Sequence, residues 1–309
     1  KLIKDALVLG TDNNFGHDFH KDALRRFELA ARDPITTGWS QMHEICKGGL
    51  GNSELGVVVA PTGAGKSMVL VHLATQALLL GKTVVYYTLE LKDTTVGQRF
   101  DCCLTKTHLG EHKQKKEEIL KKIEDIDGTL IIKEYPTKSA SVQTIKNHIE
   151  KLRKRGINPD IILLDYADLL RPVRSSSEKR HELEETYEGL RGLAQSYDIP
   201  CWTASQTNRG GLNAEVITME AISEAFNKCF VADFIFSLSR TTLDKQSNKG
   251  RVFIAKNRNG PDGIVFDAHV DWSDVTINIL DRNESVEKMQ TTTEARKILK
   301  EKYEQLQRK

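Results

Sequence analysis

The chain has 309 residues, of which 39% are hydrophobic and 28% are charged, and its formal net charge is +2. This length allows one large domain with extensions or two small domains, and the composition supports a buried core. The small net charge excludes a polycation, so any nucleic-acid surface must come from local clustering of basic residues. Because no run of eighteen apolar residues occurs and the first ten residues resemble no signal peptide, we expect no membrane partner. The start at Lys1, without Met, leads us to expect a fragment of something longer.

The five cysteines, Cys46, Cys102, Cys103, Cys201 and Cys229, are odd in number and include no C-x-x-C pair. This pattern disfavours a zinc site or a disulfide framework. Reduced thiols fit better, and we therefore expect a cytoplasmic protein.

Apolar residues recur at helical spacing in residues 2–7 and 19–30, before Asp33-Pro34. They predict one or two amphipathic helices. These helices either pack on their own domain or form a linker arm that docks on a neighbouring subunit.

From about Ile35, short apolar runs alternate with helical segments, which is typical of parallel strands covered on both faces. The runs are LGVVVA (55–60), TVVYYTLE (83–90), TLIIKEY (129–135), DIILLDY (160–166) and IPCWTAS (199–205). The sequence therefore predicts an α/β fold with a mostly parallel sheet flanked by helices.

Four later runs lie closer together along the chain and predict hairpins added to the edge of the sheet, as an antiparallel C-terminal extension. They are DFIFSLS (233–239), RVFIAKN (251–257), GIVFDAHV (263–270) and VTINIL (275–280). A polar tail follows from Glu284, in which Thr293 can cap a last amphipathic helix.

Two segments are rich in charge. Residues 106–127 read as a solvated helix face. Residues 171–180, RPVRSSSEKR, predict a mobile basic loop, with an ordinary surface loop as the alternative.

The stretch APTGAGKS, Ala60 to Ser67, nearly matches the phosphate-loop pattern G-x-x-x-x-G-K-[ST], with Ala60 in place of the first glycine. It follows a predicted strand and opens a predicted helix, as the motif requires. Its glycines let backbone amides curve around phosphates, and Lys66 reaches the β and γ phosphates. We therefore expect an ATP site, with Mg²⁺ as the metal.

Three polar residues follow buried strands, at the edge of the sheet where ligands bind. Asp165 ends the run IILLD and, with Ser67, is the expected Mg²⁺ ligand. Glu90 follows the strand that we expect next to the phosphate-loop strand, and it can polarise the attacking water. Gln206 ends another strand and can sense the γ-phosphate.

Together these motifs resemble the ATPase domain of replicative hexameric helicases of the DnaB type, which have a RecA-like fold. The likeness runs from about Thr36 to Leu280. The markers occur in the family's order: PTGAGKS, TLEL, IILLDYADLL, SQTNR, VADFIFSLSR and KNRNGPDG. The last is the most restrictive. The family tolerates a residue other than glycine at the position of Ala60, and the divergence is compatible with a phage-encoded member in a host cytoplasm.

The resemblance implies that Lys256 and Arg258 act in trans, with Arg258 as the arginine finger of the neighbouring subunit's site. The catalytic residues would then be Glu90, Lys66, Gln206, Arg258 and Lys256. The expected nucleotide-binding residues are Thr62, Gly63, Ala64, Gly65, Lys66, Ser67 and Arg99.

Two loops should line a central channel and grip single-stranded DNA through its phosphates. One is the basic stretch 171–180, and the other follows Gln206. The family's R-E-S-G segment corresponds here to SEAF, so only its acid, Glu224, is retained. The expected DNA-binding residues are Arg171, Arg174, Lys179, Arg180, Arg209, Gly210, Gly211 and Glu224.

The predicted organisation is a helical linker arm (1–34), an ATPase domain (35–283) and a polar tail with a helix (284–309). The leading function is a ring-forming, ATP-driven helicase, 5′ to 3′ by resemblance, with a primase, loader or polymerase as further partners. Two alternatives share the fold: a RecA-type recombinase or signalling ATPase, and an ATP-switched loader or scaffold.

Overall fold

The computed structural model describes residues 16–24, 27, 32–173, 178–207, 214–217 and 229–280. The chain forms two compact units, Lys1–Asp33 and Pro34–Lys309. In the first unit, residues 19–24 form turns instead of the start of the helix predicted over 19–30. The Asp18 carboxylate accepts the N–H groups of His20 and Lys21, both at 3.0 Å, and such local bonds compete with a helix. The helix predicted over 2–7 and the tail from Glu284 lie outside the described residues.

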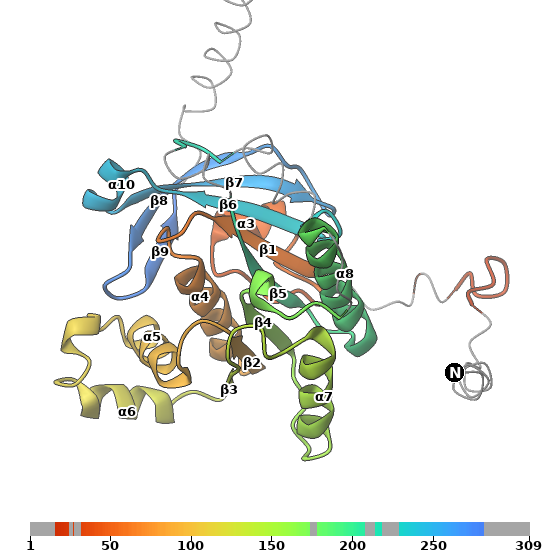
Figure 1. Ribbon diagram of the computed structural model, residues 1–309, viewed down its shortest axis with the longest axis horizontal. Coiled ribbons are helices and arrows are strands. Elements are labelled where there is room, and N and C mark those ends of the chain that lie inside the picture. Colours follow the sequence, from red (N-terminus) through yellow and green to blue (C-terminus); the bar gives the residue numbers. More distant parts are fainter. Residues whose placement is uncertain are drawn as a thin grey trace, which may run out of the picture. The chain divides into compact units, whose positions relative to one another are not determined.

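In the second unit, the described strands form a nine-stranded sheet in the order β3-β2-β4-β5-β1-β6-β7-β8-β9 (Figure 1). Six strands, from β3 to β6 in this order, are parallel, and β7, β8 and β9 extend the sheet in antiparallel fashion. The strands are β1 (Leu55–Ala60), β2 (Thr83–Thr88), β3 (Thr129–Glu134), β4 (Ile161–Asp165), β5 (Cys201–Gln206), β6 (Phe234–Ser239), β7 (Lys249–Asn257), β8 (Val265–Asp271) and β9 (Thr276–Ile279).

The expected neighbour relation between the strand before Glu90 and the phosphate-loop strand is wrong, because β4 and β5 lie between β2 and β1. Helix α4 (Lys66–Leu79) makes the connection. Consecutive strands are neighbours in a sheet in only about two-thirds of cases, and the pattern of apolar runs does not specify the exceptions. The sequence analysis also placed residues 233–239 in the hairpin extension, which is wrong. This strand, β6, pairs in parallel with β1, and the antiparallel part begins with β7.

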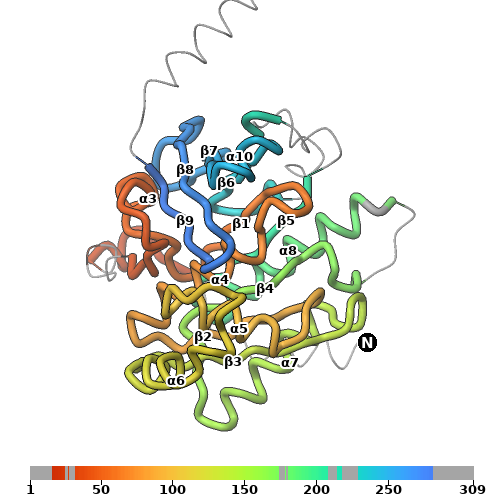
Figure 2. The backbone as a smooth tube through the Cα atoms, turned by 90° about the vertical axis from the view of Figure 1, so that its left-hand side faces the viewer, coloured from red at the N-terminus to blue at the C-terminus, as the bar shows by residue number. Residues whose placement is uncertain are grey.

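Helices cover both faces of the sheet (Figures 1 and 2). Alternate residues of the buried strands join two separate cores, such as Val58 on the α4 side and Val57 or Val59 on the α8 side. The helices and 3-10 turns are α3 (Ser40–Ile45), α4, α5 (Asp93–Thr105), η1 (Leu109–Glu111), α6 (Lys116–Glu124), α7 (Val142–Arg153), η2 (Ala167–Leu169), α8 (Lys179–Tyr197) and α10 (Thr242–Gln246).

The charged segment 106–127 contains η1 and α6, and α6 is exposed except for Ile119, as its composition predicts. The basic stretch 171–180 is shorter as a loop than predicted, because α8 already begins at Lys179. Its first turn carries an i,i+4 ion pair between Arg180 and Glu184, which favours the helix. Within the described residues, no helix combines the length and the apolar character needed to cross a membrane.

Candidate nucleotide site

The phosphate loop joins the end of β1 to the first turn of α4. Gly63 and Gly65 have φ angles of +73° and +107°, which side chains rarely adopt. Ala60 is the last residue of β1, fully buried and in register with Gln206 of β5. Because Ala60 lies in extended backbone, its position needs no glycine.

A cavity of about 250 Å³ opens beside this loop at the carboxyl edge of the sheet. It brings together eight of the residues that we expect in the nucleotide site, from four different segments. These are Thr62, Gly63, Gly65, Lys66, Ser67, Glu90, Arg99 and Gln206. Ala64, the other loop residue expected to bind nucleotide, is buried.

Asp165 is fully buried at the end of β4. Burial raises the pKa of its carboxyl group, and hydrogen bonds from Ser67 and Tyr86 oppose the shift. The Tyr86 hydroxyl donates to Oδ2 at 3.1 Å, while Oδ1 has no hydrogen-bond partner among the described residues. A buried carboxylate oxygen without a partner, next to the Ser67 hydroxyl, is a donor set that fits Mg²⁺.

Gln206 connects the phosphate loop to the neighbouring strand ends. Its side-chain N–H donates to Thr62 Oγ1 at 2.6 Å, and its Oε1 accepts from the Tyr166 hydroxyl at 3.3 Å. Its backbone N–H donates to Asp168 Oδ2 at 3.4 Å. The amide can therefore respond to what the loop holds, because it is tied to the loop and to β4 at once.

Three residues of the cavity were missed by sequence reasoning: Met68, Tyr166 and Trp272. Tyr166 directly follows Asp165, and its ring lies 5.5 Å from Lys66 Nζ. Trp272, in the turn between β8 and β9, packs so closely on the loop that a Cβ at Gly65 would lie 2.1 Å from its ring. No sequence signal reveals this contact, since it depends on how the antiparallel extension folds back.

Arg258 and Lys256 lie at the opposite edge of the sheet. Asn257 at the end of β7 pairs with Phe234 of β6, which in turn pairs with Gly56 near the start of β1. The phosphate loop begins four residues further on, so at least about 13 Å of strand separates the two edges. Arg258 is therefore remote from the phosphate loop of its own chain.

The turn KNRNGP is held rigidly to the rest of the unit. The Asn257 side chain donates to the carbonyls of Ile45 (2.9 Å) and Pro261 (3.1 Å). The Asn259 side chain donates to Glu54 at 2.9 Å. A Cβ at Gly260 would lie 2.4 Å from the Ile45 carbonyl oxygen, so only glycine fits there. This packing explains the residue types around Arg258 without assigning them a catalytic role.

The expected DNA-binding residues are only partly described. Arg171 is exposed, and its backbone N–H donates to the Ala140 carbonyl at 2.8 Å. Arg180 is 60% exposed and pairs with Glu184 at 2.9 Å, a surface pair that a phosphate can displace at little cost. Both follow β4 and so lie beyond the same sheet edge as the phosphate loop. Outside the described residues are Arg174, Arg209, Gly210, Gly211, Glu224 and the side chain of Lys179.

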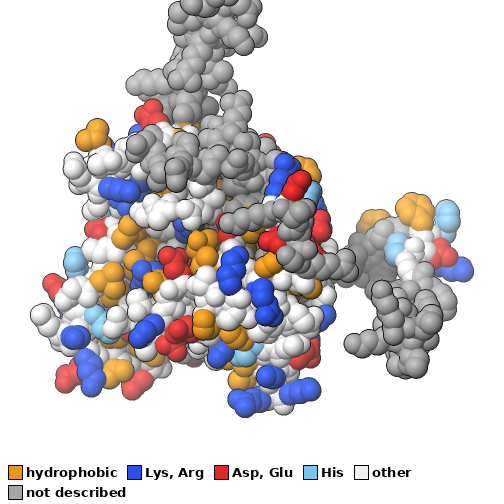
Figure 3. All heavy atoms as spheres, in the orientation of Figure 1, with side chains coloured by type: hydrophobic (Ala, Val, Ile, Leu, Met, Phe, Trp, Pro, Cys, Tyr) orange, Lys and Arg blue, Asp and Glu red, His pale blue; other side chains and the backbone are white. Residues whose placement is uncertain are grey.

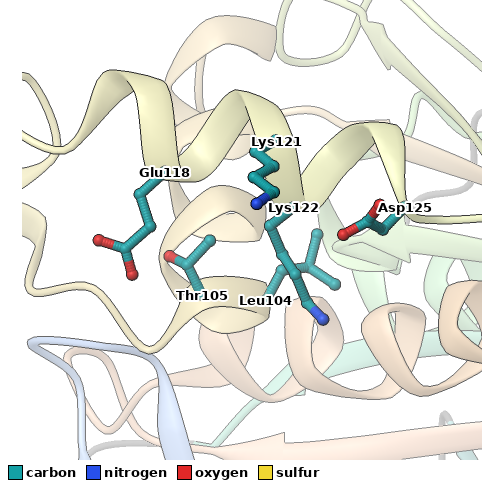
Figure 4. Close-up of a pocket in the computed structure, with 6 residues that line it drawn as sticks. All are labelled: Leu104, Thr105, Glu118, Lys121, Lys122 and Asp125. Carbon is teal, nitrogen blue, oxygen red and sulfur yellow. The ribbon is translucent and has the colours of Figure 1, made fainter.

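Basic and acidic side chains are interspersed on the face that Figure 3 shows, with no single-sign surface across it. A second cavity, of about 240 Å³, lies between α5 and α6. Figure 4 shows Lys122 between Glu118 and Asp125 along its α6 side. Its charged lining residues are two acids and two lysines of one segment, Glu118, Lys121, Lys122 and Asp125, in contrast to the polar groups that converge from four segments at the phosphate loop.

Three kinds of known protein resemble this chain: a family model, curated relatives and solved structures. The family model described as "DnaB-like helicase C terminal domain" matches residues 34–274. The "DnaB-like replicative helicase" of Enterobacteria phage T4 is 28% identical over 258 residues, covering 78% of this chain and 54% of the relative. The "Replicative DNA helicase DnaB" of Buchnera aphidicola subsp. Acyrthosiphon pisum (strain APS) is 23% identical over 276 residues, covering 81% and 58%. The chain thus spans a little over half the length of these curated relatives.

A solved structure entitled "The Structure Of A DnaB-Like Replicative Helicase And Its Interactions With Primase" matches with a TM-score of 0.71 at 16% identity. The match covers 90% of this chain and 70% of that one. This likeness confirms the RecA-like fold class predicted from the sequence.

Proposed function

The chain belongs to the family of DnaB-like helicase C-terminal domains, and on that premise we propose that it is a ring-forming motor driven by ATP hydrolysis. The motor moves along single-stranded DNA and separates duplexes in replication, 5′ to 3′ as in the family that it resembles. One observation carries the proposal: the chain has a nucleotide cavity at one edge of its sheet and Arg258 at the other.

Within one subunit, five residues at this edge have roles that their positions support: Lys66, Ser67, Glu90, Asp165 and Gln206. Lys66 and the loop amides bind the β and γ phosphates, and the N-terminus of α4 adds partial positive charge. Glu90 orients the attacking water and accepts its proton. Ser67 and Asp165 would hold Mg²⁺, which when bound neutralises charge on the phosphates. Gln206 senses the γ-phosphate through its contact with Thr62.

Arg258 completes the site of the next subunit. Stabilising the charge on the transferred phosphoryl group requires a guanidinium beside the γ-phosphate. The distance across the sheet keeps Arg258 away from its own cavity, whereas a head-to-tail ring brings opposite edges of adjacent subunits together. Lys256 would accompany it. A closed ring, expected to be a hexamer, then becomes part of the catalytic machinery.

DNA lies in the channel of the ring, held by residues of the two loops that follow β4 and β5. These loops begin at the sheet edge that carries the nucleotide cavity, so hydrolysis can move them. The arm 1–34 would latch each subunit to the next, since Phe19, Leu24 and Phe27 are exposed apolar side chains. A primase is a further partner by analogy with the solved relative, and the host cytoplasm is the expected location.

The proposal predicts that Arg258→Ala and Lys66→Ala each abolish ATP hydrolysis, while the Arg258 variant still binds nucleotide. Removing a trans-acting arginine costs about 10³-fold or more in kcat. Steady-state ATPase assays and titration with a fluorescent ATP analogue measure the two effects. Mixing the two inactive variants should restore hydrolysis, because a Lys66→Ala subunit still donates an intact Arg258. Full activity of Arg258→Ala alone would contradict the trans arrangement.

A further inference from the structure

A buried carboxylate contacts the side chain of Arg258. The Asp233 side chain is 6% exposed, and its Oδ1 lies 3.1 Å from Nη1 of Arg258. The backbone carbonyl of Asp233 also accepts the N–H of Arg258 at 3.0 Å. One residue therefore fixes both the backbone and the guanidinium of the proposed finger.

The same carboxylate holds a second arginine and the start of a central strand. Arg191, in the middle of α8, donates to Oδ1 at 3.0 Å and to Oδ2 at 3.2 Å. The backbone N–H of Leu55, at the start of β1, donates to Oδ2 at 3.0 Å. Asp233 thus joins β1, α8 and the finger at one point.

We propose that Asp233 is the positioning residue of the Arg258 finger, with Arg191 as the second cation that holds the carboxylate in place. This inference rests on the proposed function, since it assigns a role in delivering Arg258 to the neighbouring subunit. Asp233 acts through Arg258 and touches no substrate itself.

The geometry favours positioning over inactivation of the finger. An arginine has five N–H donors in a planar fork, and the contact with Asp233 is made through Nη1. The Arg258 side chain is 45% exposed, so the other donors of the fork can face a phosphate while Asp233 holds Nη1. Without the carboxylate, the arginine gains rotamers and meets the like charge of Arg191, so its direction is lost.

Lys256, the other proposed trans cation, is anchored separately. Its Nζ donates to the carbonyl of Phe230 and lies 4.4 Å from the centroid of that ring. Burial and the charge of Arg258 lower its pKa. A change at Asp233 should therefore affect Arg258 first and leave the Lys256 anchor in place.

The test uses Asp233→Asn, which keeps an acceptor for the Leu55 N–H but loses the charge. Asp160→Asn is the matched control, because Asp160 precedes β4 as Asp233 precedes β6, and its carboxylate accepts the Thr83 N–H at 2.6 Å. Thermal unfolding should show the larger loss for Asp233→Asn, which also breaks the Arg191 pair, so kcat is compared at a temperature at which both variants remain folded. The assembled Asp233→Asn protein should lose about 10- to 100-fold in kcat with unchanged nucleotide affinity, as a misplaced group does, whereas Asp160→Asn keeps its kcat.

Two further measurements distinguish loss of Arg258 positioning from a general loss of structure. The double variant Asp233→Asn/Arg258→Ala should have the kcat of Arg258→Ala alone, because the first change acts only through the second residue. Mixing Asp233→Asn with Lys66→Ala subunits should restore hydrolysis as mixing Arg258→Ala with Lys66→Ala does, because the Lys66 variant supplies a well-positioned finger.

Either of two results overturns the inference while the proposed function stands: full kcat for Asp233→Asn, or no rescue of it by Lys66→Ala when Arg258→Ala is rescued. Full kcat for Arg258→Ala overturns the proposed function and this inference with it.

Discussion

At the scale of single residues, Gly65 illustrates how the antiparallel extension constrains the phosphate loop. Its φ of +107° disfavours any side chain, and a Cβ would meet the Trp272 ring at 2.1 Å. At Gly63, with φ of +73°, an added Cβ would have only Lys245 Nζ near it, at 3.9 Å. Both glycines therefore have a positive φ that disfavours a side chain, and only at Gly65 would a side chain also clash with a neighbouring ring.

We predict that Gly65→Ala destabilises the protein without nucleotide by about 1–3 kcal/mol more than Gly63→Ala, because it adds overpacking to strain. Urea unfolding of the two variants measures the difference. Adding Trp272→Ala to Gly65→Ala should reduce the extra destabilisation caused by Gly65→Ala, because the ring that the new Cβ meets is then absent. Equal stabilities for the two glycine variants would contradict the Trp272 contact.

His72 of α4 gives a pH prediction. It is buried, its Nε2 contacts the Thr37 carbonyl at 3.0 Å, and its ring stacks on Trp39 at 4.6 Å. Burial lowers its pKa from 6.5 to about 4. Between these values the unfolded chain binds a proton that the folded chain does not, so stability falls as the pH drops from 6.5 towards 4.

The full effect is about 3 kcal/mol, of which about 1 kcal/mol is lost by pH 5.5. His72→Gln keeps a donor for Thr37 and removes the titration. Comparing urea unfolding at pH 7.5 and 5.5 should show a larger loss for the wild type than for the variant. The same loss in both proteins would assign the pH dependence to other groups.

The chemistry-bearing residues at strand ends could be predicted from the sequence, whereas their supports could not. Asp165 and Gln206 follow buried apolar runs, and parallel strands bring such ends to one edge. Asp233 precedes β6 and Trp272 follows β8, and pairing between distant segments sets the place of both strands in the sheet. An acid directly before the apolar run FIFSL was a signal for Asp233, but its two arginine partners come from distant segments.

At the scale of elements, the sequence predicted which segments form strands but did not predict the order of the strands in the sheet. Each apolar run predicted in the parallel part is a strand of the sheet, because β-branched and aromatic residues there fill both cores. The order depends on pairing between segments that are distant in the sequence: β2 pairs with β3 and β4 instead of β1. The apolar pattern carries no information on which strands pair.

Helix α8 links the two edges of the sheet through residues one turn apart. The Tyr187 hydroxyl lies 2.8 Å from Asp168 Oδ1 and 3.2 Å from the Ala204 carbonyl, while Arg191 holds Asp233. Asp168 in turn accepts the backbone N–H of Gln206. The helix is thus tied, through Asp168, to Gln206, the proposed γ-phosphate sensor, and, through Asp233, to Arg258, the proposed finger.

We predict that Tyr187→Phe costs about 1–3 kcal/mol in unfolding free energy, because it removes the hydrogen bonds of a fully buried hydroxyl to Asp168 and to the Ala204 carbonyl. Tyr197→Phe on the same helix should cost less, since its partner Glu150 is exposed to water and can be resolvated. Chemical denaturation compares the two. A larger loss for Tyr197→Phe would contradict the importance of the Tyr187 contacts.

At the scale of the whole molecule, the phosphate loop and Arg258 lie at opposite edges of the sheet. On the proposed function these are two halves of one catalytic site, which a neighbouring subunit completes. This arrangement distinguishes a ring motor from a nucleotide switch that works as a single chain, because only the ring requires a neighbour for turnover.

The most direct test of the motor is unwinding of a forked DNA duplex in the presence of ATP, with either the 5′ or the 3′ single-stranded arm removed and Lys66→Ala as the inactive control. Our account predicts unwinding of the substrate that keeps its 5′ arm, and none by the control. Hydrolysis of ATP without unwinding of either substrate would contradict it.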